Sequence, residues 1–270
     1  MTYCVAMRLN AGLVFLADSR TNAGVDQIST FRKMTVFEYP GERLLVLLAA
    51  GNLAVTQAVR QIVCERAGPH DDSVWNATTM FEATRVVGEA VREVRRRDAP
   101  AMREADIEFN CNFIFGGQIK GEDMRLFQIY SAGNFIEATP ETLYFQIGES
   151  KYGKPILDRV LTSKTPLDQA AKCVLVSMDS TLKSNLSVGL PLDLVVYQND
   201  RLQTEQVVCV DEQNPYFQMI HGSWGDKLRE VFESLDEPQW NGGSQGTPLR
   251  VNSARYEPMR KITHPGEKIV

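Results

Sequence analysis

The sequence predicts an α+β protein with mainly antiparallel sheets, and three observations carry that prediction. Apolar residues follow strand-like and helical spacing in separate blocks: strands, two helices, strands, two helices, strands and one helix. The strand-like runs are almost continuously apolar, which is typical of strands covered on both faces. The chain has 270 residues, 43% of them hydrophobic, and can therefore bury a substantial core. Two sheets packed face to face, with helices outside each, agree with all three observations.

The N-terminal blocks predict four strands followed by two helices. The strands are expected at Tyr3–Leu9, Gly12–Ser19, Lys33–Tyr39 and Arg43–Ala50. Residues 10 and 11 are a turn signal, which predicts a hairpin of the first two strands. Helical spacing follows over Val55–Val63 and Ala83–Val94, and the segment Asp98 to Pro100 is expected to end the second helix. Two helices in succession are expected to pack side by side.

The remaining blocks predict five strands, three helices and a tail. Strands are expected at Phe109–Ile119, Arg125–Ser131, Tyr144–Ile147, Leu192–Tyr197 and Glu205–Val210. Helices are expected at Lys154–Leu161, at Pro166–Ser180 with Thr165 as N-cap, and around the stripe Trp224, Leu228, Val231, Phe232 and Leu235. Residues 236–270 are rich in glycine and proline and keep neither period. We therefore expect one domain over residues 1–235 and a C-terminal extension over 236–270, mobile or ordered against another subunit.

Composition excludes several classes of function. The net charge of −5 argues against nucleic acid or an anionic membrane as the main partner. No apolar run reaches the ~18 residues of a membrane span, and the N-terminus does not resemble a signal peptide, so a soluble cytoplasmic protein is expected. The five cysteines and three histidines have no metal-ligand or disulfide-framework spacing. No metal and no organic cofactor are expected.

The candidate nucleophile is Thr2. Methionine before a small residue such as threonine is normally removed, which exposes Thr2 as the first residue. A free N-terminal threonine combines a hydroxyl nucleophile with an α-amine that can take its proton. The pKa of an α-amine is about 7.7–8.0, so the amine is partly neutral near pH 7 without tuning. This chemistry needs no histidine.

An acidic residue is expected beside Thr2. If the first two strands form a hairpin over residues 10 and 11, residue numbers that sum to about 21 pair across it, and Thr2 lies beside Asp18. Asp18 is the only acidic residue among the first 25 and ends a buried strand, so it needs a partner. Lys33, which begins the next strand, and Arg20 are both candidates. A buried Asp18–Lys33 pair either lowers the pKa of the Thr2 hydroxyl or is a structural ion pair.

Gly51 is the candidate oxyanion-binding residue. It follows an apolar strand and precedes a helix, where backbone N–H groups are unpaired and the helix dipole is positive. An oxyanion formed at a carbonyl attacked by Thr2 is expected to bind there. A strand-to-helix turn that merely requires glycine explains the same residue.

The segments around these residues resemble the proteasome β-type subunits, which are N-terminal-nucleophile hydrolases. The matching segments, in order and spacing, are Thr2-Tyr-Cys-Val-Ala, Gly12-Leu-Val-Phe-Leu-Ala-Asp-Ser-Arg-Thr-Asn-Ala-Gly24, Arg32-Lys-Met34 and Ala49-Ala-Gly-Asn52. The opening Thr2-Tyr-Cys-Val-Ala-Met, the chain length and the tail resemble the bacterial proteasome-like Anbu group most, and the Arg-Lys pair resembles the HslV peptidase. The resemblance covers residues 2–235.

This resemblance implies a fold and a set of roles. The fold is a four-layer αββα sandwich. Thr2 is the nucleophile, Asp18 and Lys33 are the charged pair, the Gly51 N–H forms the oxyanion hole, and Arg20 supports the site. The family's Asp-x-x-Ser-Gly-Gly segment corresponds to Ser184-Asn-Leu-Ser187-Val-Gly189, with serine in place of aspartate, and its Gly-Ser-Gly segment corresponds to Gly148-Glu-Ser150.

Three functions remain open at this level. The first is a threonine-type endopeptidase that acts on peptides or proteins and restricts access by self-assembly, as a closed ring, an open ring or a helix. The second is a hydrolase for a specialised small amide, because this fold hosts many amide hydrolyses. The third is an assembly scaffold with a weak or silent site. A homo-oligomer is expected in each case, and the sequence identifies no partner ATPase.

Overall fold

The structure is a computed structural model that describes residues 2–22, 28–68 and 72–237. The chain divides into two compact units, Met1–Gly222 and Ser223–Val270. Most of the expected C-terminal extension, residues 238–270, lies outside the described residues. Within the described ranges, no helix combines the length and the apolar character needed to cross a membrane.

Two five-stranded sheets form the centre of the first unit. The first has the order β10-β1-β2-β11-β12 and contains β1 (Tyr3–Leu9), β2 (Gly12–Asp18), β10 (Tyr144–Gly148), β11 (Leu192–Gln198) and β12 (Gln206–Val210). The second has the order β5-β6-β7-β8-β9 and contains β5 (Met34–Tyr39), β6 (Arg43–Gly51), β7 (Cys111–Ile119), β8 (Arg125–Ile129) and β9 (Phe135–Glu137). A separate ribbon pairs β3 (Arg20–Asn22) with β4 (Ile28–Thr30). Every neighbouring pair is antiparallel.

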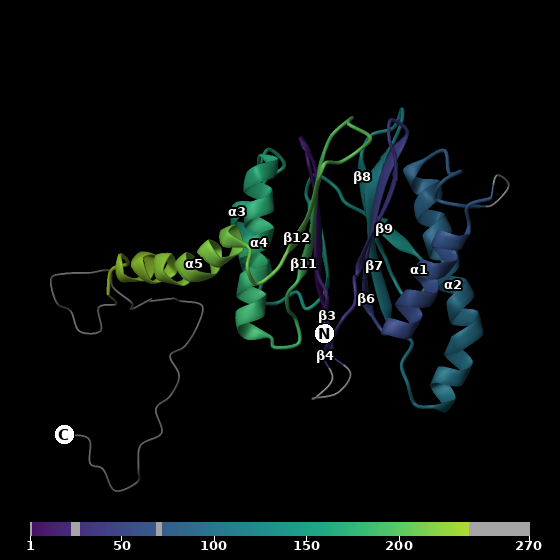
Figure 1. Cartoon of the computed structure of the whole chain (residues 1–270), viewed down its shortest axis with the longest axis horizontal. Helices are drawn as coiled ribbons and strands as arrows, with labels where there is room; N and C mark the ends of the chain where they lie inside the picture. The colour runs from purple at the N-terminus through teal and green to yellow at the C-terminus, as the bar shows by residue number, and fades with distance from the viewer. Residues whose placement is uncertain (1, 23–27, 69–71, 238–270) are drawn as a thin grey trace, which may run out of the picture. The chain divides into compact units, whose positions relative to one another are not determined.

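Helices cover the outer face of each sheet, as Figure 1 shows. The helices α1 (Leu53–Glu65) and α2 (Met80–Glu104) pack against each other and on the second sheet, and α3 (Lys154–Val160) and α4 (Leu167–Ser184) lie on the first. The expected four-layer αββα sandwich of two antiparallel sheets is confirmed. The last helix, α5 (Pro215–Glu233), ends before Leu235.

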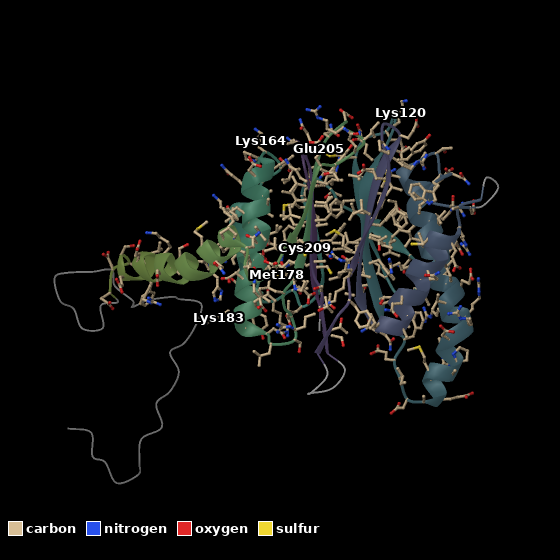
Figure 2. The ribbon with its side chains drawn as sticks, viewed as in Figure 1. Lys120, Lys164, Met178, Lys183, Glu205 and Cys209 are labelled. Atoms are coloured by element: carbon tan, nitrogen blue, oxygen red, sulfur yellow. The ribbon has the colours of Figure 1, made fainter. Side chains whose placement is uncertain are left out.

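The strand β6 shows why its apolar run is unbroken. Leu44, Val46 and Leu48 belong to the core between the two sheets, whereas Leu45 and Leu47 belong to the core under α1 and α2. Successive side chains of a strand point to opposite faces, so both faces here must be apolar. Figure 2 shows the side chains that fill the spaces between the layers.

The β1–β2 hairpin has the register that the sequence predicts. Cys4 pairs with Ala17 and Leu9 with Gly12. Each pair of numbers sums to 21, as expected from the turn at residues 10 and 11. Thr2, which directly precedes β1, therefore lies next to the end of β2.

The expected end of the second helix at residues 98–100 is wrong, because α2 continues to Glu104 with Pro100 inside it. Proline removes one backbone hydrogen bond, here to the carbonyl of Arg96, four residues earlier. Both Pro100 and Arg96 are exposed, so water can solvate that carbonyl. The break expected from proline is therefore inexpensive at this point of the helix.

The expected N-cap of α4 is also wrong. Pro166 occupies the N-cap position, and the Thr165 hydroxyl instead accepts a hydrogen bond from the Thr162 N–H (2.9 Å). The helix extends to Ser184, beyond its expected end, and buries Thr181 on the way. The strands β3, β4 and β9, each three residues long, are too short for a period-two pattern to reveal.

Candidate active site

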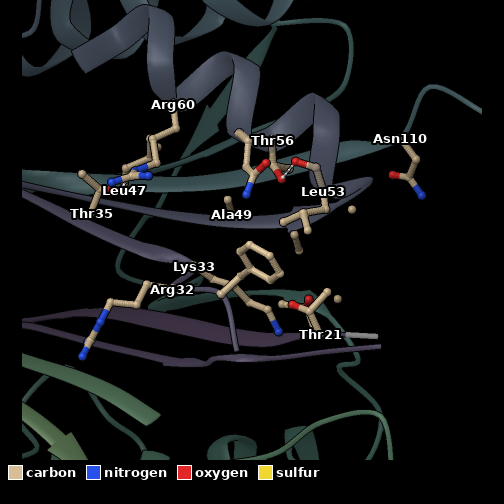
Figure 3. Close-up of a pocket in the computed structure, with 16 residues that line it drawn as sticks. Thr21, Arg32, Lys33, Thr35, Leu47, Ala49, Leu53, Thr56, Arg60 and Asn110 are labelled. Carbon is tan, nitrogen blue, oxygen red and sulfur yellow. Dashed lines mark hydrogen bonds between the residues drawn. The ribbon is translucent and has the colours of Figure 1, made fainter. Parts of the chain in front are cut away.

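Thr2, Lys33 and Gly51, which are far apart in sequence, line one cavity of about 460 Å³. Figure 3 shows this cavity between α1, which contributes Arg60, Thr56 and Leu53, and the segment that carries Lys33. The cavity therefore brings together the candidate nucleophile, the lysine of the candidate charged pair and the candidate oxyanion-binding residue.

Asp18 lies at the end of β2, is fully buried and bonds to Lys33, which lines this cavity. Its Oδ1 accepts hydrogen bonds from Lys33 Nζ (2.7 Å) and from the Tyr3 N–H (3.0 Å), and its Oδ2 accepts one from the Gly189 N–H (3.4 Å). Burial raises the pKa of the Asp18 carboxyl, and the Lys33 ammonium and the two N–H groups act in the opposite direction. Lys33, not Arg20, is the ion-pair partner.

Lys33 is held on two sides and is only 9% exposed. Besides its bond to Asp18, Nζ donates to the carbonyl oxygen of Arg20 (2.6 Å). An ammonium group has three donors, and these two bonds use two of them. The position of the ammonium is thus set by the last residue of β2 and the first residue of β3.

Backbone contacts hold Thr2 in place. Its carbonyl oxygen accepts a hydrogen bond from the Glu149 N–H (2.6 Å), and the next residue, Tyr3, pairs with Gly148 at the end of β10. Gly148 has φ +83°, and a Cβ there would approach the Thr2 carbonyl oxygen to 1.9 Å. Only glycine lets β10 lie this close to the candidate nucleophile.

Gly51 ends β6 and directs a backbone N–H toward the cavity. The N–H of Ala49 in β6 donates to the Lys33 carbonyl on the β5 side (2.9 Å), whereas the N–H of Asn52, directly after β6, donates to the Asn110 carbonyl on the β7 side (2.8 Å). Because N–H groups alternate between the two sides of an antiparallel strand, the Gly51 N–H points to the same side as that of Ala49. At that level β5 has not begun, so the group faces the cavity that Gly51 lines.

The helix α1 begins at Leu53, two residues after Gly51. Asn52 is its N-cap, and the Asn52 side chain accepts hydrogen bonds from the N–H groups of Ala54 and Val55. The positive end of the α1 dipole therefore lies beside the Gly51 N–H. Together these groups form an electropositive backbone site that suits an oxyanion.

Arg20 connects the ion pair to the loop after α4. Its Nη1 donates to the Leu186 carbonyl (3.2 Å), and a Cβ at Gly189 would come within 2.0 Å of its Nε. Gly189 therefore lies directly against the guanidinium and donates to Asp18 at the same time. Arg20 therefore contacts the loop that bonds to the buried carboxylate.

The three candidate serines lie outside the cavity lining in the described part of the chain. Ser184 is the exposed last residue of α4, Ser187 is half-buried in the following loop, and the Ser150 carbonyl accepts from the Lys154 N–H (3.2 Å). The loop is instead tied to the Thr2 side of the site by Asn185, which donates to Glu149 (3.2 Å).

Cys4 is a second potential nucleophile close to the ion pair, but its environment disfavours that role. It is fully buried, and burial raises the pKa of its thiol strongly. The Sγ donates weakly to the Ala49 carbonyl (3.8 Å). Because the thiolate is the reactive form, Cys4 acts as a small apolar core residue.

The fold matches solved structures over most of the chain. An Anbu (ancestral beta-subunit) from Yersinia bercovieri is 57% identical, with a TM-score of 0.83, over 87% of this chain and 98% of that one. The chain belongs to the Anbu family. An Anbu complex from Pseudomonas aeruginosa, described as a helical assembly, is 50% identical, with a TM-score of 0.84, over 88% and 98% of the two chains. No protein-family model and no curated protein matches the chain.

The sequence did not predict the backbone hydrogen bonds that hold Asp18 and Thr2 in this Anbu chain. The N–H groups of Tyr3 and Gly189 on Asp18, and that of Glu149 on the Thr2 carbonyl, carry no residue-type signal. The sequence indicates these contacts only through Gly148 and Gly189. A Cβ at Gly148 would overlap the Thr2 carbonyl oxygen, and a Cβ at Gly189 would overlap the Arg20 guanidinium.

Replacing Gly148 with alanine tests the contact with Thr2. We expect Gly148→Ala to displace Thr2 and to lower the reaction rate of Thr2 with a threonine-directed reagent by about tenfold or more, since misplacement by an ångström has a large effect. Gly121→Ala is a matched control, because Gly121 also has a positive φ but no atom within 4 Å of an added Cβ. Equal labelling of both variants would contradict the proposed contact.

Proposed function

We propose that this Anbu chain is a threonine-type peptidase in which Thr2 is the nucleophile once Met1 has been removed. The observation that carries the proposal is the shared cavity: Thr2, Lys33 and Gly51 line it, and the buried Asp18 holds the Lys33 ammonium at 2.7 Å. Thr2 supplies a nucleophile, Lys33 a cation and Gly51 an N–H that can donate a hydrogen bond to an oxyanion, all in one cavity.

The first half of the reaction forms an ester. The Thr2 Oγ1 attacks the scissile carbonyl, and its proton passes to the Thr2 α-amine, directly or through a water. Lys33 favours the developing alkoxide with its remaining donor, while Asp18 balances the charge of the buried ammonium. The carbonyl oxygen becomes an oxyanion that the Gly51 N–H and the α1 dipole stabilise.

The second half releases the product. The tetrahedral intermediate collapses, the amine of the leaving peptide takes the proton from the Thr2 α-ammonium, and an ester to Thr2 remains. Water attacks this ester with the α-amine as base. The resulting α-ammonium returns the proton to the Thr2 Oγ1 as the ester bond breaks, and the acyl product leaves as a carboxylic acid. No step needs a redox partner or a metal ion, since the amine and Lys33 supply the proton transfer and the charge.

The proposed substrate is a peptide or an unfolded protein, and the proposed working form is a homo-oligomer. The helical assembly of the relative from Pseudomonas aeruginosa, 50% identical to this chain, supports self-assembly. A chamber built from copies of the chain restricts the open cavity to chains that can enter. A ring, an open ring and a helix each satisfy this requirement.

Intact mass before and after incubation with a threonine-directed β-lactone tests the proposal. We expect a mass without Met1 and one adduct, located on Thr2 by peptide mapping. Such an adduct requires both an exposed threonine hydroxyl and an activating environment. A mass that retains Met1 would exclude the α-amine as base, and a processed chain without adduct would favour the assembly scaffold with a silent site.

A further inference from the structure

The cavity extends well beyond Thr2, along one face of α1. Leu53, Thr56, Gln57 and Arg60 all line it, and their spacing of three and four residues places them on one side of the helix. Figure 3 shows Arg60 directed from α1 toward Thr35 on β5. The far end of the cavity is therefore polar and carries a guanidinium group.

In the part of the chain that the structure describes, three cationic side chains line the cavity, and they differ in whether an acidic residue pairs with them. Lys33 is paired with Asp18, and Arg32 is paired with the buried Asp193. Arg60 has no such partner among the described residues: its Nε donates to the neutral hydroxyl of Thr35 (3.0 Å). No carboxylate lines the cavity within the described ranges. Among the described residues that line the cavity, Arg60 is thus the cation whose charge is available to a ligand.

The register of β5 and β6 gives the distance between Arg60 and the expected position of the scissile bond. Thr35, to which Arg60 donates, lies opposite Leu47 on β6. Leu47 is four residues before Gly51, which corresponds to roughly 13 Å at the rise of an antiparallel strand. With the scissile carbonyl at Gly51, a side chain of the substrate that follows the cavity extends toward Arg60. A long side chain such as glutamate reaches further along this path than aspartate.

We propose that Arg60 is a specificity-determining residue that selects a glutamate side chain next to the scissile bond. This inference rests on the proposed function for the position of the cleaved bond. A guanidinium forms charge-assisted, often bidentate hydrogen bonds with a carboxylate. The hydroxyl of Thr35 lies next to this contact as a further polar group. The substrates are therefore peptides with an acidic residue at this position.

Binding to the Thr2→Ala protein tests the inference without requiring catalysis. The probes are fluorescein-labelled tripeptide amides with the sequence Leu-Leu-X, where X is glutamate, aspartate, glutamine or lysine. Because Arg60 is exposed to solvent, we expect a moderate preference: the glutamate peptide binds about three- to tenfold more tightly than its glutamine isostere. The preference decreases as salt is added.

Variants of Arg60 complete the experiment. Arg60→Gln is expected to give the glutamate peptide the affinity of the glutamine peptide, and Arg60→Glu to favour the lysine peptide. Arg96→Gln is the matched control, since Arg96 is an exposed arginine of α2 outside the cavity lining. Equal affinities of the glutamate and glutamine peptides, or no binding of either, overturn the inference. The proposed function is judged separately, by the β-lactone adduct on the wild-type chain.

Discussion

Thr2→Ala is expected to abolish hydrolysis and β-lactone labelling while leaving the fold intact. Loss of a covalent nucleophile reduces turnover by roughly five orders of magnitude or more in well-studied hydrolases. The folded structure depends on Thr2 mainly through its carbonyl, which alanine retains. The melting temperature should therefore change little. Peptide turnover and intact mass measure the first effect, and thermal unfolding measures the second.

Two controls make this prediction specific to the hydroxyl of Thr2. Thr2→Ser keeps a hydroxyl and an α-amine, so it should keep labelling and measurable turnover. Thr21→Ala removes another threonine hydroxyl that lines the same cavity and has no hydrogen-bond partner among the described residues. Its labelling should remain near that of the wild type. Continued turnover by purified Thr2→Ala protein would exclude Thr2 as the nucleophile.

The Asp18–Lys33 pair should be essential for both stability and chemistry. Removing one partner leaves the other as an unpaired buried charge, which destabilises by about 3–5 kcal/mol. We therefore expect Asp18→Asn and Lys33→Met each to lose about that free energy of unfolding, measured by denaturant titration. The double variant should recover much of it, because it leaves no unpaired charge.

The activity of the same three variants separates structure from catalysis. If Lys33 stabilises the alkoxide of Thr2, both single variants and the double variant should lose labelling by orders of magnitude, although the double variant is folded. If the pair is structural only, the double variant should regain labelling together with stability. Additive losses of stability in the double variant would contradict the coupling itself.

The pH dependence of Lys33→Met has a defined sign. Burial raises the pKa of the Asp18 carboxyl, and removing the cation raises it further. A carboxyl whose folded pKa lies above its unfolded value of about 3.9 binds a proton more readily in the folded state. Proton binding therefore stabilises the fold at low pH, and this stabilisation is lost as the pH rises through the folded pKa. Lys33→Met should therefore unfold more easily at about pH 8 than at about pH 5. Asp18→Asn should lack this dependence.

The hairpin at the N-terminus shows how much a local pattern can predict. A two-residue turn and two apolar runs of equal length specify one register, and that register brings Thr2 next to Asp18. The choice between Lys33 and Arg20 as the partner of Asp18 stayed open, because both lie within 15 residues of it. The structure decides it: the side chain of Lys33 reaches the carboxylate, whereas that of Arg20 reaches the Leu186 carbonyl.

Helix ends show the opposite case. Proline at position 100 and threonine at position 165 are local signals for a helix end and a helix start. Neither holds in the structure, because α2 continues past Pro100 and Pro166 is the N-cap of α4. Whether proline ends a helix depends on the solvation of one carbonyl, and whether threonine caps a helix depends on which N–H its hydroxyl reaches. Both depend on the tertiary surroundings, which the local sequence does not contain.

The sequence by itself determined the four layers and the hairpin register, and it named the candidate nucleophile and the candidate charged pair. These follow from apolar periodicity and from the cost of burying an unpaired carboxylate, which are properties of the local chain and of residue type. The tertiary structure alone decided the direction of the Gly51 N–H and the contacts of Gly148 and Gly189, and it left Arg60 without an acidic partner among the described residues. Backbone groups carry no residue-type signal, and a charge is balanced or unbalanced only through residues distant in sequence.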